Sequence, residues 1–392
     1  IALERTSQPA TFVSDEERQD KRSSDAEVAK PDAEYAQLLI YFKRALLLHC
    51  GIRRSDVIDY ANVTAGSRLL KIPFRLYGSH RIGAVQEKSL DIAREMGLEG
   101  GVHISNLAGR RGYAVAEVSI AQRAITHISA LKPQVPPSDY LSVALGETAA
   151  GKPYWIDLDQ LPHLLVAGTS GSGKSYLLRG LLHQLTTFYD ENDLRIVIVD
   201  GKGIGEYRAF RESPHLLDNS AYLDQRDRVP RYFKEDLLEL WLPEMQKLFL
   251  QESETLAERT GKMATSLREL QCHAAEEGIM LESRPLVVVI DEFAELAPVD
   301  TDGELDAIVA RFTSIGRALG AHLILATQYP RWDVVTGTIK ANCARLSLQV
   351  RSSNDSIVIL DEGGAEELMD NGDLLFKRDG RTMVQLQSYD VG

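Results

Sequence analysis

The stretch GTSGSGKS, residues 168–175, holds residue types that together suit a phosphate group. Four residues separate Gly168 from the triplet Gly173-Lys174-Ser175, with an apolar run before the stretch and a Leu-rich helical pattern after it. Glycines let successive backbone N–H groups face one anion, and a helix that follows points its positive end at the same place. Lys174 is expected to reach the β- and γ-phosphates of a nucleotide, and Ser175 to hold Mg²⁺. The predicted phosphate-binding residues are Gly168, Thr169, Ser170, Gly171, Ser172, Gly173, Lys174 and Ser175.

A second stretch, RPLVVVIDEFAEL over 284–296, ends an apolar run in two acids. The run predicts a buried strand, so Asp291 at its carboxyl end is placed to bind the magnesium shell and Glu292 to polarise the attacking water. Two acids after a strand are also compatible with an ordinary exit into a loop. The phosphate-binding loop earlier in the chain favours hydrolysis, with ATP and Mg²⁺ as the cofactors.

Short runs rich in Val, Ile and Leu must position these residues. From residue 140 onward such runs alternate with helical patterns, which predicts an α/β fold with a mainly parallel sheet covered by helices on both faces. The expected strands are HLLVAG, LRIVIVD, PLVVVID, AHLILAT and ARLSLQV. The fourth ends in Thr327, with Gln328 directly after it, and Arg311 and Arg317 stand on the helical pattern before it. From spacing alone, Gln328 is expected to be a solvated amide and the two arginines to pair with acids at a surface.

The chain is predicted to divide into three parts. Residues 1–34 are polar and charged, which is typical of a linker or disordered arm. Residues 35–134 begin with an apolar helical stripe and a second short helix over 53–63, expected to pack together, with a helix-turn-helix-like element as the alternative. A strand, a helix and two strands follow and describe a small α+β domain. Residues 135–392 form the predicted α/β domain.

Composition restricts the partners and the location. The 392 residues include 44 Lys and Arg against 57 Asp and Glu, a net charge of −13. This balance argues against a broad basic face that coats nucleic acid, but it permits a ring that grips a polyanion through a few pore residues. Three scattered cysteines without C-x-x-C spacing favour a reducing, cytoplasmic location. No apolar run approaches the roughly 18 residues that span a bilayer, although a start at Ile1 leaves room for a membrane tether or another domain upstream.

Several blocks, in order, make the chain resemble the FtsK/SpoIIIE family of DNA translocases. They are the phosphate loop with the residues before it, VDGKG with the later SPHLL, LWLPEM, VVVIDEFAEL, GRALGAHLILATQYPRWDVVTGTIKAN and ILDEGGAEELMDNGDLLF. The segments IKAN and GGAEELMDNGDLLF are not general features of phosphate-loop proteins, so they make the match specific. The similarity covers Leu69 to Phe376 and is strongest from Leu141 onward. It implies a RecA-like P-loop NTPase preceded by a small ring domain, in a homo-hexamer that threads double-stranded DNA without sequence preference.

The resemblance also implies roles for single residues in ATP hydrolysis between subunits. It gives the residues of the phosphate loop and Asp291 the roles expected above, and makes Glu292 the residue that activates water. Gln328 would sense the γ-phosphate. Arg317, in GRALGAH, matches the family's trans-acting arginine finger better than Arg311 does.

The segment 329–342, YPRWDVVTGTIKAN, matches a loop that faces the pore in that family. Arg331 and Lys340 are therefore candidate contacts to DNA phosphates, and Trp332 could brace the loop or touch the substrate. Arg351 is a third candidate, close to Ser353, which stands where the family usually has a lysine.

Two further departures bear on the DNA contacts. Tyr329 replaces the usual arginine of a Gln-Arg-Pro motif, and the loop 297–304 is acidic where a basic residue would help to hold DNA. These departures leave the ATPase residues untouched.

Two other functions compete with a DNA motor. Type VII secretion ATPases resemble the same family but move polypeptide, and they carry several motor modules in tandem where this chain has one. A nucleotide-binding scaffold without hydrolysis is the other alternative, and the intact set from Lys174 to Gln328 argues against it.

Overall fold

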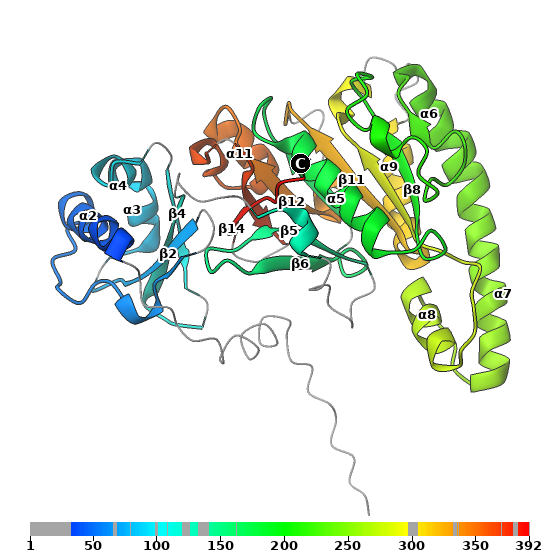
Figure 1. Cartoon of the computed structure of the whole chain (residues 1–392), viewed down its shortest axis with the longest axis horizontal. Helices are drawn as coiled ribbons and strands as arrows, with labels where there is room; N and C mark the ends of the chain where they lie inside the picture. The colour runs from blue at the N-terminus through cyan, green and yellow to red at the C-terminus, as the bar shows by residue number, and fades with distance from the viewer. Residues whose placement is uncertain are drawn as a thin grey trace, which may run out of the picture.

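In this computed structural model the described residues are 33–65, 69–78, 80–98, 101–107, 109–119, 126–131, 141–161, 163–296, 305–331, 335, 337–369, 371–378 and 383–391. The predicted arm lies outside them except for residues 33 and 34. The connector 132–139, the acidic loop 297–304 and Trp332 also lie outside. Two sheets organise the described residues, a four-stranded one followed by a ten-stranded one (Figure 1).

The large sheet has the strand order β6-β5-β14-β13-β12-β7-β11-β10-β8-β9. The strands from β12 to β9 run parallel to one another, and those from β6 to β13 extend the sheet in antiparallel fashion. The parallel strands are β7 (His163–Ala167), β8 (Arg195–Val199), β9 (Tyr222–Leu223), β10 (Leu286–Ile290), β11 (Ala321–Thr327) and β12 (Cys343–Leu348). The antiparallel strands are β5 (Ser142–Glu147), β6 (Pro153–Asp157), β13 (Asp373–Lys377) and β14 (Val384–Gln387).

The α/β fold with a mainly parallel sheet is confirmed, and the five predicted strands are the central ones. The antiparallel extension was not predicted. Its strands lie before and after the alternating pattern of strands and helices, and they find their places only through pairing, as β14 does with β5 and β13.

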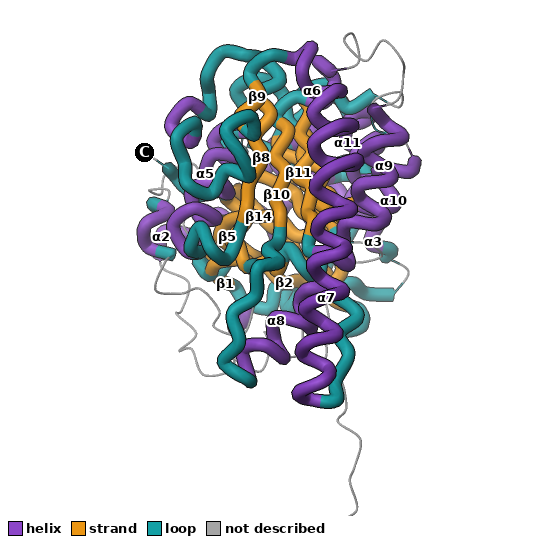
Figure 2. The backbone as a smooth tube through the Cα atoms, turned by 90° about the vertical axis from the view of Figure 1, so that its right-hand side faces the viewer, coloured by secondary structure: helices purple, strands orange, loops and turns teal. Residues whose placement is uncertain are grey.

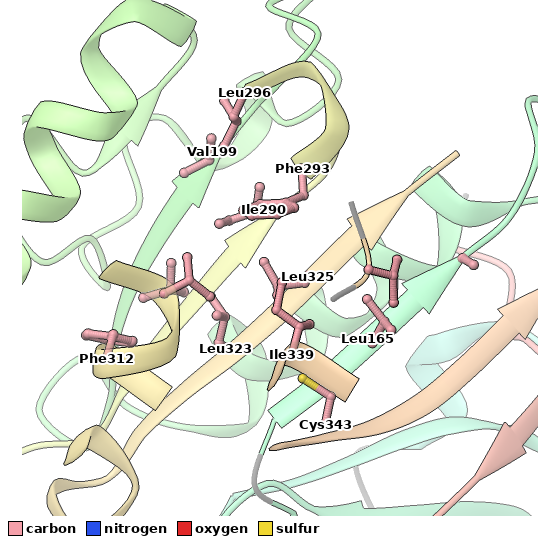
Figure 3. Close-up of a cluster of buried hydrophobic side chains, with 14 of the residues drawn as sticks. Leu165, Val199, Ile290, Phe293, Leu296, Phe312, Leu323, Leu325, Ile339 and Cys343 are labelled. Atoms are coloured by element: carbon pink, nitrogen blue, oxygen red, sulfur yellow. The ribbon is translucent and has the colours of Figure 1, made fainter. Parts of the chain in front are cut away.

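Each face of the parallel strands has its own apolar core, because alternate residues of a strand point to opposite faces. Leu164 of β7 belongs to the core under α5 (Lys174–Phe188). The next residue, Leu165, belongs to the opposite core, together with Phe312 of α9 (Leu305–Gly316) and Ile339 of α10 (Gly337–Asn342), as Figure 3 shows. Burial on both faces explains why these strands read as continuous apolar runs.

A helical insertion lies between β8 and β10. One continuous helix runs through α6 (Val229–Arg231), a π-helical stretch η6 (Tyr232–Trp241) and α7 (Leu242–Thr260). It packs against α8 (Leu267–Glu276), which starts at Ser266 with a side-chain cap. Figure 1 shows α7 and α8 at the end of the molecule far from the small sheet, and Figure 2, which faces that end, shows α7 as a long helix. In the described part of the chain, no helix combines the length and the apolar character that crossing a membrane needs.

The small sheet is antiparallel, with the order β1-β2-β4-β3 and helices on its outer side (Figure 1). Its core includes an edge-to-face pair, Phe42 and Phe74, with ring centroids 5.4 Å apart. The strands are β1 (Thr64–Ala65), β2 (Leu69–Arg75), β3 (Val102–Asn106) and β4 (Tyr113–Ser119), and the helices are α2 (Ala33–Cys50), α3 (Ile82–Gln86) and α4 (Ser89–Glu95).

The second short helix predicted over 53–63 is wrong. Ile58 bridges Phe74 of β2, and only Tyr60–Asn62 form a single 3₁₀ turn. Pairing with β2 outweighs the weak helical periodicity of this stretch, so neither a two-helix unit nor a helix-turn-helix element is present there.

A polar seam joins the small sheet to the large one. The Ser119 hydroxyl donates to Asp373 at 2.7 Å, and the Gln385 backbone N–H donates to Glu117 at 3.2 Å. The Ser89 hydroxyl donates to both oxygens of Glu367 at 2.8 Å. We refer to these six residues together as the seam: Ser89, Glu117, Ser119, Glu367, Asp373 and Gln385.

Candidate nucleotide site

The phosphate-binding loop joins β7 to α5, as predicted, at the carboxyl edge of the parallel strands. Gly171 and Gly173 have φ values of 89° and 101°, which only glycine adopts without strain. A β carbon at Gly173 would also lie 3.0 Å from the Gly372 backbone nitrogen. The loop is held from both sides, because the Thr169 N–H donates to the Gln349 carbonyl at 2.9 Å and the Gly372 N–H donates to the Ser172 carbonyl at 3.0 Å.

Within the loop, Ser170 and Gly171 are exposed, whereas Ser172 and Lys174 are buried. Gly168 is packed tightly, since a β carbon there would lie 2.6 Å from the Ser172 hydroxyl oxygen. Ser175 follows Lys174 in the first turn of α5 and is half-buried. The exposed backbone at the helix start is the geometry that phosphate recognition requires.

Asp291 and Lys174 meet in a buried ion pair between β10 and α5. Lys174 Nζ donates to Asp291 Oδ1 and to the Asp291 carbonyl oxygen, both at 2.6 Å. The two side chains are 0% and 2% exposed, and Lys174 Nζ also lies 3.7 Å from Glu292 Oε2. The two motifs, far apart in the sequence, therefore form one cluster.

Glu292 is fixed by the end of the neighbouring strand β11. The Thr327 hydroxyl donates to Glu292 Oε1 at 2.9 Å, and the Gln328 N–H donates to both carboxylate oxygens at 2.9 and 3.0 Å. Burial raises the pKa of Glu292 above its usual range, while the charge of Lys174 and these hydrogen bonds act in the opposite direction. Gln328 thus adjoins the site through its backbone.

Sequence reasoning gave no role to the loop after β8, which also reaches Asp291. Lys202 Nζ lies 3.6 Å from Asp291 Oδ2 and 3.6 Å from Glu206 Oε2. Tyr207 is buried, and its burial, together with the charges of Asp291 and Glu206, raises the pKa of its hydroxyl well above the usual range. The sequence carries two signals for this loop. The segment VDGKG is one of the blocks that resemble the family, and it stands at the end of a predicted strand of the same parallel sheet.

Three buried polar atoms around Asp291 have no hydrogen-bond partner within the described residues. They are Asp291 Oδ2, Glu206 Oε2 and the Tyr207 hydroxyl. Buried polar atoms are nearly always bonded to protein or water. Carboxylate and hydroxyl oxygens left open next to a phosphate-binding loop are the groups that a hydrated Mg²⁺ ion prefers, so these residues fit that ion.

Arg317 lies far from this cluster in its own chain. It occupies the 3₁₀ turn η8 (Arg317–Leu319) before β11 and is exposed, as is Arg311 on α9. The site residues Thr327 and Gln328 stand at the other end of β11. Neither arginine forms an ion pair within the described residues, although the charge of Arg317 acts on Asp159, which pairs with Arg268 instead.

The candidate DNA contacts differ in their surroundings. Arg331 and Arg351 are exposed, and the Arg351 guanidinium lies over the Tyr329 ring, 5.4 Å from its centroid. Lys340 has a side chain only 12% exposed and binds Asp361, which Arg345 binds as well. A contact between Lys340 and DNA would require this ion pair to open.

The chain is similar to known proteins over this same region. The FtsK/SpoIIIE family matches residues 131–331, just over half of the 392 residues. The DNA translocase FtsK of Leptospira interrogans is 34% identical over 258 residues, which are 64% of this chain and 25% of that protein. The Helicobacter pylori protein of the same name is 38% identical over 246 residues, 62% of this chain and 27% of its own length. The Haemophilus influenzae protein of that name is 33% identical over 249 residues, which are 61% of this chain and 47% of that protein. The chain thus spans between a quarter and half of these relatives.

Two solved structures share the fold. The pCW3 conjugation coupling protein TcpA, in its monomer form with ATPγS, aligns with a TM-score of 0.55 and 22% identity over 92% of this chain and 96% of its own. The cytoplasmic domain of the Thermomonospora curvata type VII secretion ATPase EccC aligns with a TM-score of 0.57 and 23% identity. This alignment covers 68% of this chain and 32% of that one. At these identities the likeness concerns the fold alone.

Proposed function

This chain belongs to the FtsK/SpoIIIE family, and on that basis we propose that it is an ATP-driven motor that moves double-stranded DNA. The observation that carries the proposal is the buried cluster in which Lys174, Asp291 and Glu292 meet beneath the phosphate-binding loop. The relatives named DNA translocase FtsK support DNA rather than polypeptide as the cargo.

In this proposal ATP and Mg²⁺ bind at the start of α5. The exposed N–H groups of Ser170 and Gly171 face the phosphates, and Lys174 moves from Asp291 to meet them. Ser175 and Asp291 hold the metal ion. When bound, Mg²⁺ supplies positive charge that neutralises the phosphate oxygens.

Glu292 holds the position of the general base. Its carboxylate is aimed by Thr327 and by the Gln328 N–H, so it cannot swing away from the site. A pKa raised by burial makes it a stronger acceptor for a proton from water. The Gln328 backbone N–H donates to this base, which supports a role for the Gln328 amide side chain in sensing the γ-phosphate.

Arg317 supports a ring with sites between subunits, which we propose to be a homo-hexamer. The seven residues of β11 separate it from Gln328, a distance of about 20 Å along an extended strand. An arginine on the opposite sheet edge can complete only a neighbour's site, and such arginines contribute strongly to phosphoryl transfer.

DNA is proposed to bind through a few exposed cations, since the chain as a whole carries −13. Arg331 and Arg351 follow β11 and β12 at the edge where the nucleotide site lies. A ring repeats each cation once per subunit, so a few positions can supply many phosphate contacts. Contacts to phosphate alone would make binding independent of base sequence and steeply dependent on salt.

The test is the ATPase rate with and without long duplex DNA. We expect DNA to raise the rate, and we expect the double variant Arg331→Ala, Arg351→Ala to lose most of this stimulation. Lys340→Ala should lose less of the stimulation by DNA, because the Lys340 ammonium group is already paired with Asp361. Lys262→Ala, at the tip of α7 beside Glu276, is the matched surface control and should behave as the wild type.

Two results would redirect this proposal. Stimulation by a polypeptide but by no duplex would make the chain a polypeptide motor. Tight nucleotide binding without any turnover, in the presence of DNA and Mg²⁺, would make it a scaffold.

A further inference from the structure

The loop after β8, residues 200–207, is a built part of the nucleotide site. Asp200, which is 1% exposed, accepts the Gly203 N–H at 3.1 Å and the Gly205 N–H at 2.9 Å. Both glycines have positive φ, 66° and 78°. The buried carboxylate therefore fixes the turn from which Lys202 extends.

Lys202 and Lys174 face different carboxylate oxygens of Asp291. Lys174 takes Asp291 Oδ1 at 2.6 Å, whereas Lys202 faces Oδ2 at 3.6 Å. Gly201 makes the approach possible, because a β carbon there would lie 2.7 Å from the Glu292 carbonyl oxygen. Asp291 thus faces two lysines, one from the start of α5 and one from the loop after β8.

The two lysine side chains differ in how far they are exposed to solvent. Lys174 is 2% exposed and lies at the start of α5, where it serves the phosphates in the proposed reaction. Lys202 is 21% exposed and is shared with Glu206. Once Lys174 leaves Asp291, a fully buried carboxylate loses its closest cation, which is strongly destabilising unless another charge is near. Among the described residues, Lys202 is the cation that remains within ion-pair distance.

We propose that Lys202 is a positioning residue that stabilises the charge of Asp291 when Lys174 moves to the phosphates. The exchange then leaves no buried carboxylate unpaired, and Asp291 keeps its place for the metal ion. This inference rests on the proposed function, because it requires a nucleotide at the loop. Lys202 acts on the phosphates only through Asp291 and Lys174.

The test is the Kd of a fluorescent ATP analogue for the full chain, measured with Mg²⁺ and with EDTA. Lys202→Met should weaken binding about tenfold, as loss of an outer-shell partner commonly does. The effect should be larger in EDTA, where Lys202 takes the place of the metal ion as the cation next to Asp291. Lys202→Arg should restore binding. Lys262→Met, a surface lysine paired with Glu276, should bind as the wild type does. Thermal unfolding without nucleotide checks that each variant is folded, and Lys202→Arg keeps the test decisive if Lys202→Met is unstable.

A double-variant cycle with Asp291→Asn identifies the route of the effect. If Lys202 acts through the charge of Asp291, Lys202→Met should change Kd little in the Asp291→Asn background. An equal loss in both backgrounds would mean a direct contact with phosphate and would overturn the proposal, as would a Lys202→Met variant that binds like the wild type. A wild type that does not bind the analogue would instead remove the proposed function and this inference with it.

Discussion

The nucleotide site and the seam are both clusters of buried polar groups, but their charges are matched in different ways. At the nucleotide site carboxylates face lysines, with Asp291 between Lys174 and Lys202. At the seam the acids accept hydrogen bonds from neutral donors, as Asp373 does from Ser119 and from the Gln385 amide at 2.9 Å.

The difference indicates what each cluster can do. A lysine on a flexible stem can exchange one anion for another, so the nucleotide site is able to respond to a charged ligand. Hydroxyl and amide donors in the seam bind its acids, and burial raises the pKa of both Glu117 and Glu367. The seam is therefore suited to holding the two sheets in a fixed relation.

The largest expected effect separates chemistry from binding at the nucleotide site. Glu292→Gln keeps the shape and the hydrogen bonds from β11 but removes the base, so we expect turnover to fall about 100-fold or more with nucleotide affinity retained. Steady-state ATPase rates and nucleotide titrations measure the two quantities. A variant that hydrolyses ATP at the wild-type rate would show that Glu292 is not the base. Asp373→Asn, in the seam, is the matched carboxylate control.

The next effect tests whether the nucleotide site is shared between subunits. Arg317→Ala should lower turnover by at least 10-fold, because it removes a cation from the neighbour's transition state. A mixture of Arg317→Ala and Lys174→Ala subunits should regain activity, since some interfaces then contain both wild-type residues. Arg311→Ala is the control on the same helical segment. Full activity of Arg317→Ala in a monomeric protein would exclude a shared site.

A smaller effect is expected at the seam, on stability rather than on chemistry. Asp373 is 1% exposed, and its carboxylate accepts from the Ser119 hydroxyl, the Gln385 amide and the Met369 N–H. Asp373→Ala removes the acceptor of the Ser119 hydroxyl and of the Met369 N–H, whereas the Gln385 amide still donates to the Ser119 hydroxyl oxygen at 3.1 Å. The free energy of unfolding should therefore fall by about 2 kcal/mol. Urea unfolding measures the change, and Ser119→Ala, which removes one donor only, should cost less. An unchanged midpoint would mean that the seam contributes nothing to stability.

The smallest effect concerns pH. Burial raises the pKa of Glu117 in the folded chain, although the charge of Lys71 opposes it. A carboxyl group whose pKa is raised by folding stabilises the fold at low pH, and this contribution is lost as the pH rises through the raised pKa. Glu117→Gln should therefore be more stable than the wild type at pH 7.5 and as stable as the wild type at pH 4. Melting curves at the two pH values measure it, and an equal shift at both would contradict the raised pKa.

Much of the nucleotide site was determined by the sequence itself. The glycines of 168–175, the apolar strand before them and the helix after them are all local features, and a loop with these properties has few other conformations. The same holds for Asp291 and Glu292, because a buried strand must end where polar residues begin. Parallel strands then bring both motifs to one edge, as the contact between Lys174 and Asp291 shows.

Other features were decided only by tertiary structure. Residues 53–63 have a weak helical period, yet Ile58 pairs with β2, and β14 becomes a strand by joining β5 and β13. The sequence offers Lys340 as a candidate DNA contact, and only the fold shows that Asp361 lies beside it. Likewise, Lys202 meets Asp291 only because β8 lies next to β10. In each case the deciding partner is distant in sequence. Periodicity and motif spacing describe a residue's immediate neighbours in the chain, whereas electrostatic and strand-pairing energies depend on which distant residue the completed fold brings close.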